Sequence, residues 1–132
     1  MSTLITVITI LSLALAGLMV ALQIAIRLRA RALRGTPAPA VGGPLGKRIA
    51  RGKTALVYFH SPTCGACRPF TPRLQAMARA NPAVHVVDVA QQLDVARAFG
   101  VLTTPSTVEI ADGRIVDCRV GAPSRELLGR FA

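Results

Sequence analysis

"ALVYFHSPTCGACR", residues 55–68, is the stretch of sequence on which the fold prediction depends. Its apolar start predicts a buried strand, and its Cys-x-x-Cys pair lies where the next helix begins. Backbone N–H groups and the dipole at a helix start favour a thiolate on Cys64, and the thiolate is the species that attacks a disulfide. Cys67, one turn later, is placed to resolve a mixed disulfide. The spacing alone also fits half of a zinc site, or chance.

A second motif makes the redox interpretation specific. Thr103-Thr104-Pro105 precedes a strand-like run at 106–110, which Asp112-Gly113 joins to another strand ending near Gly121. Together with the Cys-x-x-Cys pair, these features resemble the thioredoxin family over residues 53–131. The resemblance implies a thioredoxin-like fold and thiol–disulfide exchange on protein substrates. It implies no cofactor beyond the redox-active disulfide Cys64–Cys67, and no metal.

The soluble part of the chain alternates strands and helices. We expect strands at 54–60, 83–89, 106–111 and 114–120, and helices at 65–80, 91–99 and 124–131. The order βαβαββα predicts parallel pairing in the strand–helix–strand units and antiparallel pairing in the hairpin through Asp112-Gly113. The fold class is therefore α/β, a thioredoxin-like βαβαββα sandwich preceded by one N-terminal transmembrane helix.

The N-terminal region predicts the membrane helix. Residues 4–26 carry no charge, and 23 residues rise about 34 Å as a helix, enough to cross a bilayer. A cleaved signal peptide is the alternative, although it normally has a basic start and a shorter apolar core. We expect three parts: the helix with its basic flank at 1–34, a Pro/Gly linker at 35–46 that holds the domain off the membrane, and the thioredoxin-like domain at 47–132. We expect a short helix at 47–52 within that domain.

The positive charge is concentrated beside the predicted span. The net charge is +10, yet eight Lys and Arg residues between Arg27 and Lys53 have no acid among them. From Thr54 onward, eight arginines against six acids leave only +2. This distribution suits lipid headgroups next to residues 4–34 and excludes nucleic acid as a partner. The positive-inside tendency places the domain in the cytoplasm, with a periplasmic domain as the alternative.

The resemblance assigns roles to residues outside the cysteine pair. Pro105 is expected to be a cis proline lying against the cysteines, and Thr104 to offer its backbone to an extended substrate. Gly121 matches a glycine that lets the substrate backbone approach, or is an ordinary glycine at a strand end. Pro72 matches the proline that kinks the active-site helix, and Pro69 adds irregularity near the helix start.

Three residues depart from the family pattern. Thr63 replaces the usual Trp before the first cysteine. Tyr58 replaces a buried acid that relays a proton, and Val86 replaces the lysine partner of that acid. Proton transfer to or from Cys67 then uses water, His60 or no specific group. His60 is otherwise a polar strand end. These departures favour a narrow set of partners.

The remaining cysteine leaves three interpretations open. Cys118 is expected to be a small strand residue, or else a third thiol involved in regulation or intermolecular bonding. With Cys64, Cys67 and His60 it would also complete the ligand count of a zinc site, although packing of Pro105 against the thiols disfavours metal.

These observations predict a membrane-tethered thiol–disulfide oxidoreductase that reduces partner disulfides with electrons from another dithiol protein. One alternative is a non-catalytic thioredoxin-like membrane adaptor. The other is a periplasm-facing reductase for envelope proteins or cytochrome maturation.

Overall fold

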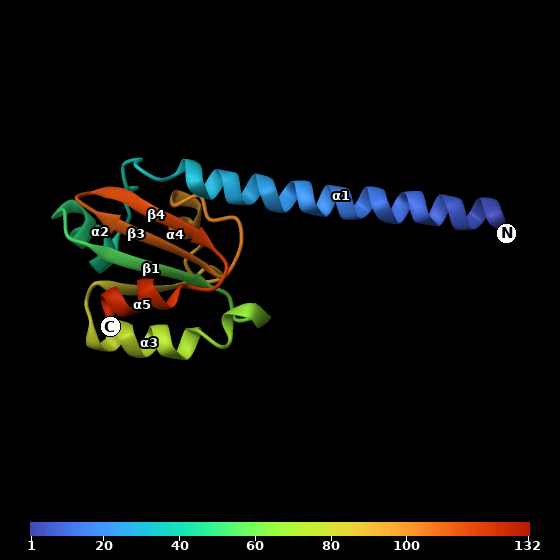
Figure 1. The fold of residues 1–132 in the computed structure, drawn as a ribbon. Coiled ribbons are helices and arrows are strands. Elements are labelled where there is room, and N and C mark those ends of the chain that lie inside the picture. Colours follow the sequence, from blue (N-terminus) through green and yellow to red (C-terminus); the bar gives the residue numbers. More distant parts are fainter.

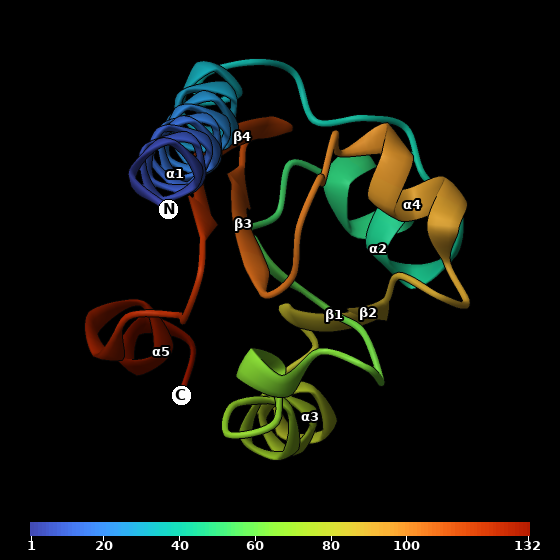
Figure 2. The same cartoon turned by 90° about the vertical axis from the view of Figure 1, so that its right-hand side faces the viewer.

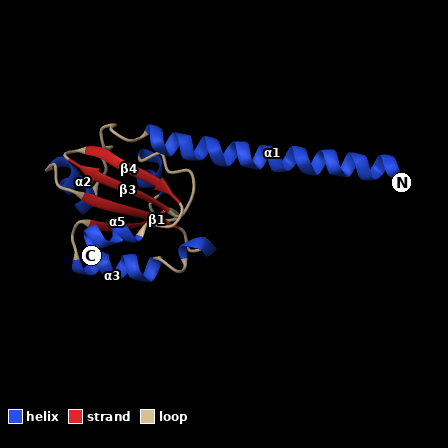
Figure 3. Cartoon of the chain, viewed as in Figure 1, coloured by secondary structure: helices blue, strands red, loops and turns tan.

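A computed structural model describes all 132 residues and shows a sheet covered by helices on both faces, with a long helix projecting from it (Figures 1 and 3). The helices are α1 Ser2–Ala32, α2 Gly43–Ala50, α3 Thr71–Ala80, α4 Leu93–Ala98 and α5 Arg125–Phe131, with a short 3₁₀ turn, η1, at Gly65–Cys67. The strands are β1 Ala55–His60, β2 Val84–Asp88, β3 Ser106–Ala111 and β4 Arg114–Val120. The predicted α/β sandwich behind one N-terminal apolar helix is confirmed.

The sheet order is β2-β1-β3-β4. β1 and β2 are parallel, as predicted, whereas β3 runs antiparallel to β1, so the prediction of parallel pairing for the second strand–helix–strand unit is wrong. The reason is the length of α4. Its six residues rise only about 9 Å, too little to return the chain along a strand. β3 therefore starts at the end of the sheet where β1 and β2 finish, and Ser106 pairs with Phe59.

β1 is buried on both faces and divides the core in two. Ala55, Val57 and Phe59 point to the face covered by α2, α4 and the end of α1. Leu56 and Tyr58 point to the opposite face, where α3 and α5 pack. Figure 2, which looks along α1, shows these two helical layers on either side of the sheet. The continuous apolar run that identified this strand in the sequence reflects burial on both sides.

The hairpin has the predicted bounds, because its turn chemistry is specific. Asp112 and Gly113 have φ values of 53° and 72°, and a two-residue loop with positive φ at both positions matches the twist of the flanking strands. β3 and β4 pair antiparallel on either side of it.

The expected helix at 65–80 is divided. η1 ends at Cys67, and α3 begins only at Thr71. Pro69 lies in the break, consistent with the predicted irregularity, and Pro72 lies in the first turn of α3. Proline is tolerated there because those N–H groups have no partner within the helix. The expectation of one helix at 65–80 that Pro72 kinks is therefore wrong, because Pro72 lies at the start of α3.

The segment predicted to be a linker is attached to the sheet. The N–H groups of Gly35 and Ala38 donate to the carbonyls of Ile115 and Gly113, and Thr36 accepts from the Ile115 N–H. α2 begins at Gly43 and crosses the expected 46/47 boundary, and it replaces the short helix expected at 47–52. The expectation that residues 35–46 hold the domain away from the membrane anchor is wrong, because backbone pairing along β4 is more favourable than leaving these groups free.

Replacing Gly46 with Ala should destabilise the domain. A Cβ at Gly46 would overlap the backbone carbonyl of Val41, which cannot rotate away as a side chain could. Overpacking of this kind costs about 1–3 kcal/mol. Thermal unfolding of the full chain in detergent should show a Tm lowered by several degrees.

Gly129→Ala is the matched control. Gly129 lies in α5, where an added Cβ has no neighbour within 4 Å, and Ala favours a helix over Gly by up to about 1 kcal/mol. Its Tm should stay the same or rise. Equal losses in both variants would contradict the tight approach at Gly46.

Candidate functional site

The cysteine pair lies just beyond the end of β1. Ser61, Pro62 and Thr63 lead from the strand into η1, and the Cys64 N–H donates to the carbonyl of Ser61 at 3.1 Å. Cys64 and Cys67 form a disulfide with their Cα atoms 5.3 Å apart. Cys64 is half-buried, whereas Cys67 is 1% exposed. An incoming partner can therefore reach the first sulfur and not the second.

The local helix is shorter than the sequence suggested. Cys64 is the N-cap of the three-residue η1, so the helix dipole expected to stabilise its thiolate is small. The Cys67 N–H is already bonded to the Cys64 carbonyl at 3.2 Å.

The second motif reaches the same end of the sheet. The Thr104-Pro105 peptide is cis, as the resemblance implied. Because Ser106 pairs with Phe59 in β1 and with Val120 in β4, Pro105 lies at the end where the cysteines emerge. Gly121 has φ of 100° and donates its N–H to the carbonyl of Pro105 at 2.9 Å. Gly121 is thus joined to Pro105, and a side chain at this φ would be strained. We call this end, with Cys64, Cys67, Thr104, Pro105 and Gly121, the redox end.

Beneath the disulfide lies a phenol rather than an acid. Tyr58 is fully buried, and its Oη lies 3.2 Å from Thr71 Oγ1 and 3.4 Å from the Cys67 carbonyl oxygen. Thr71 also donates to that carbonyl at 2.9 Å. Val86 pairs with Tyr58 in the neighbouring strand, so no lysine faces this position. Burial raises the pKa of Tyr58 above its ordinary value of 10.0, more than the hydrogen bond with Thr71 lowers it. The phenol is therefore neutral in the range where thiols titrate.

Replacing Tyr58 with Phe should leave the pH dependence of exchange unchanged. A neutral phenol supplies no base between pH 6 and about 9, and Thr71 continues to bond the Cys67 carbonyl. The variant should lose about 1 kcal/mol of stability with the hydrogen bond. We would measure disulfide reduction from pH 6 to 9 in both proteins. If the variant lost an inflection from its pH–rate profile, or reduced disulfides tenfold more slowly at neutral pH, Tyr58 would instead be identified as a proton-transfer residue.

His60 lies at the end of β1 and stacks on Tyr58, with ring centroids 5.9 Å apart and planes inclined by 8°. It makes no hydrogen bond to either redox cysteine, a position that fits the polar strand end considered above. Its role in proton transfer stays a prediction.

Cys118 lies apart from the redox pair. It is a free thiol, 7% exposed, in the core on the face that α1 covers. Burial raises its pKa, and the nearby Asp117 carboxylate raises it further, with Arg34 acting in the opposite direction. Cys118 fits a small strand residue. The alternative zinc set is not assembled, because no three His, Cys, Asp or Glu side chains are grouped as metal ligands.

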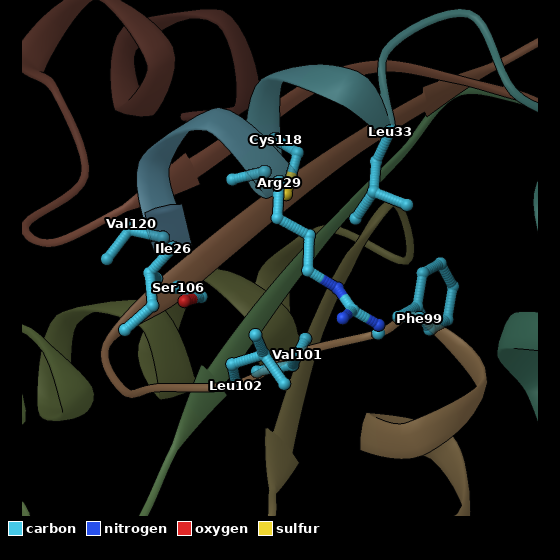
Figure 4. A pocket seen from close by; sticks show the side chains of 11 residues that line it. Ile26, Arg29, Leu33, Phe99, Val101, Leu102, Ser106, Cys118 and Val120 are labelled. Atoms are coloured by element: carbon cyan, nitrogen blue, oxygen red, sulfur yellow. The ribbon is translucent and has the colours of Figure 1, made fainter. Parts of the chain in front are cut away.

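A pocket beside α1 was not predictable from the sequence. Figure 4 shows it between the end of α1, the loop after α4, and β4, with Arg29 extending across it towards Phe99. Ile26 and Val120 line it on one side, and Cys118 lies on its sheet face. The pattern of β4 could not have indicated it, because Ile115 and Cys118 are three residues apart and share the core face only through the register shift opposite Glu109 and Ile110.

Comparison with known proteins gives one family. The family model described as Thioredoxin matches residues 45–132. A thioredoxin H-type of Fagopyrum esculentum is 37% identical over 83 residues, which cover 61% of this chain and 72% of that protein. The soluble secreted antigen MPT53 of Mycobacterium tuberculosis is 39% identical over 54 residues, 41% of this chain and only 31% of its own length.

Solved structures agree with the fold. The X-ray structure of Fasciola hepatica thioredoxin superposes with a TM-score of 0.54 at 34% identity, covering 66% of this chain and 88% of that one.

Proposed function

This chain belongs to the thioredoxin family, and from that premise we propose that it is a membrane-tethered thiol–disulfide oxidoreductase that reduces disulfides of partner proteins. Exchange chemistry follows from the family and from the Cys64–Cys67 pair. One observation carries the assignment of roles: the two sulfurs of a single disulfide differ in access, with Cys64 half-buried and Cys67 enclosed.

The exchange begins with the reduced pair. The Cys64 thiolate attacks one sulfur of the partner disulfide, a mixed disulfide forms, and the other partner sulfur leaves as a thiolate that takes up a proton. The Cys67 thiolate then attacks Cys64 Sγ, which releases the second partner thiol and closes the Cys64–Cys67 disulfide. Two electrons and two protons pass to the partner. Another dithiol protein returns the pair to its reduced form. No bound cofactor takes part in these steps.

The substrate is proposed to lie along the redox end in an extended conformation. Thr104 precedes the cis proline, and its backbone groups are available to a strand-like peptide. Gly121 carries no side chain that would obstruct that peptide. The roles of Thr104, Pro105 and Gly121 in binding rest on this arrangement.

We propose that α1 is the segment that tethers the domain to the membrane. Its apolar window has a mean hydropathy of 2.5, and none of that window is buried in the protein. A core helix of a soluble protein would be covered, and an exposed apolar surface of this size is unfavourable in water. The lipid contact through residues 4–34 would remove it. A signal sequence has a similar composition, but it is removed from the mature protein. Detecting whether α1 is cleaved off would therefore distinguish a signal sequence from a membrane span.

The domain is proposed to face the cytoplasm, since Arg27, Arg29 and Arg31 follow the span whereas no Lys or Arg precedes it. An outward-facing domain is the second candidate, favoured by the likeness to the secreted MPT53. A membrane-impermeant thiol reagent, applied to intact cells after reduction with a permeant reductant, should leave Cys64 unlabelled. Labelling of Cys64 would establish the outward orientation.

The exchange reaction itself is tested with insulin. The full chain in detergent, supplied with dithiothreitol, should accelerate the reduction of insulin disulfides above the rate with dithiothreitol alone. An unchanged rate would contradict the proposed activity.

A further inference from the structure

The last turns of α1 are fixed against β4. Ala30 is buried in the sheet core, and Leu33 packs against the same cluster. Arg34 forms an ion pair with Asp117 at 2.6 Å, and Asp117 also pairs with Arg119. Burial alone would raise the pKa of Asp117, but the hydrogen bond and charge of Arg119, with the charge of Arg34, hold it below its ordinary value of 3.8. The carboxylate therefore remains charged at neutral pH, and the attachment is maintained.

The direction of this attachment can be followed residue by residue. Gly35 bonds to Ile115 near the start of β4, and Arg34 meets Asp117 in its middle. Ile26 lines the same pocket as Val120, the last residue of β4. α1 therefore runs antiparallel to β4, and its membrane side reaches the sheet at the end where β4 finishes.

That end is the redox end. Val120 pairs with Ser106, which follows the cis Pro105, and Gly121 bonds to Pro105. Figure 1 shows η1 at the end of the domain towards which α1 projects, and Figure 2, viewed along α1 from its N-terminus, shows η1 at the front. The turn of the hairpin, at Asp112, lies at the opposite end of the sheet.

We propose that the redox end faces the bilayer surface, so that the substrates of Cys64 are disulfides of integral membrane proteins located close to the headgroups. The proposal rests on the tether and the exchange reaction proposed above. The uncharged segment 4–26 ends at Ile26, which is the first α1 residue in the pocket with Val120. The boundary of the bilayer thus lies at the level of the redox end.

The surface around this end fits such a location. Leu102 is 57% exposed and Val120 is 37% exposed, and both lie close to Pro105 in the chain or in the sheet. Arg68, directly after Cys67, is exposed, and so is Arg27 at the end of the span. Apolar and basic side chains together suit the interface with anionic lipids.

The attachment also restricts the partners by geometry. A domain on a free linker would rotate and meet soluble proteins as readily as membrane proteins. Here the end of α1 belongs to the core, so the domain keeps one orientation relative to the span. A disulfide on a membrane-embedded partner approaches the redox end by lateral diffusion, whereas a large soluble protein must enter between the domain and the bilayer.

A depth measurement tests the orientation without requiring activity. The full chain is placed in vesicles of phosphatidylcholine and phosphatidylglycerol, and a fluorophore is attached either to Cys64, in a Cys67→Ala, Cys118→Ala background, or to a cysteine introduced by Asp112→Cys with all three native cysteines replaced. We expect brominated lipids to quench the label at 64 at least threefold more than the label at 112. Equal quenching, or stronger quenching at 112, would overturn the proposal.

A second measurement tests the substrate class. One probe is a synthetic transmembrane peptide with a disulfide just outside its apolar segment, and the other is a soluble peptide with the same disulfide loop. The control variant carries a 20-residue Gly/Ser insertion between Ile26 and Arg27, which keeps residues 27–34 attached to the sheet and frees the domain by about 25 Å.

The native chain should reduce the membrane peptide at least tenfold faster than the insertion variant does, and both should reduce the soluble peptide. If the native chain and the insertion variant reduce each peptide at the same rate, the orientation of the domain does not influence substrate choice and the inference is wrong. If neither reduces either peptide, the exchange reaction fails instead, and the quenching measurement still decides the orientation.

Discussion

Replacing Cys64 with Ser should remove the whole acceleration of insulin-disulfide reduction and leave only the rate of the reductant alone, because a hydroxyl cannot supply the attacking thiolate. Cys64 is the only cysteine of the three that is not buried in the structure. No other thiol can substitute for it. The measurement is the initial rate with the full chain in detergent and dithiothreitol.

Replacing Cys67 with Ser should have the complementary effect. Attack by Cys64 still occurs, but the resolving thiolate is absent, so the mixed disulfide with the partner accumulates. Non-reducing electrophoresis would show a band that disappears on reduction. The absence of such a band with any membrane or soluble partner would favour the non-catalytic adaptor.

Cys118→Ser is the matched control for both variants. Cys118 is buried on the far side of the core from α3, and its raised pKa keeps it a thiol at neutral pH. Exchange by this variant should remain within about twofold of the native rate. A loss as large as that of Cys64→Ser would reassign the nucleophile.

The strands and the hairpin were predictable because their sequence signals are local. The apolar run at 55–59 and the Asp112-Gly113 turn each specify a backbone conformation on their own. The placement of Cys64 and Pro105 at the same end of the sheet followed from the family resemblance. Local sequence patterns alone would not have placed them together, because the pairing of Phe59 with Ser106 joins segments more than 40 residues apart.

The predictions that failed all concern features that are determined by tertiary contacts and not by local sequence. A Pro/Gly-rich segment predicts a linker, yet residues 35–38 complete hydrogen bonds along β4 that composition does not reveal. The length of α4, rather than the strand–helix–strand order, set the direction of β3. Ala30 and Leu33 lie among the arginines of the basic flank, and nothing local in that flank predicts that its apolar side chains pack on the sheet.

Replacing Leu11 and Leu15 with Arg should remove the chain from the membrane. Both residues are more than 60% exposed on α1, near the middle of the uncharged segment. Each arginine at the centre of a span costs about 3 kcal/mol relative to leucine on insertion scales. Together they oppose insertion by about 6 kcal/mol, which corresponds to more than a ten-thousandfold shift. After a sodium carbonate wash, the native chain should remain in the membrane pellet and the variant should not.

The matched control replaces the same two leucines with Ala, which keeps the segment uncharged and helical. This variant should stay in the pellet, because an apolar helix of the same length still spans the bilayer. The intact mass of the native chain, measured by mass spectrometry, distinguishes a membrane span from a cleaved signal sequence. A native chain shortened at its N-terminus and released into the soluble fraction would identify α1 as a signal sequence, and a full-length chain released by carbonate would contradict the span. Either result would also remove the basis for a redox end that faces the bilayer, since α1 would then no longer fix the domain at the membrane.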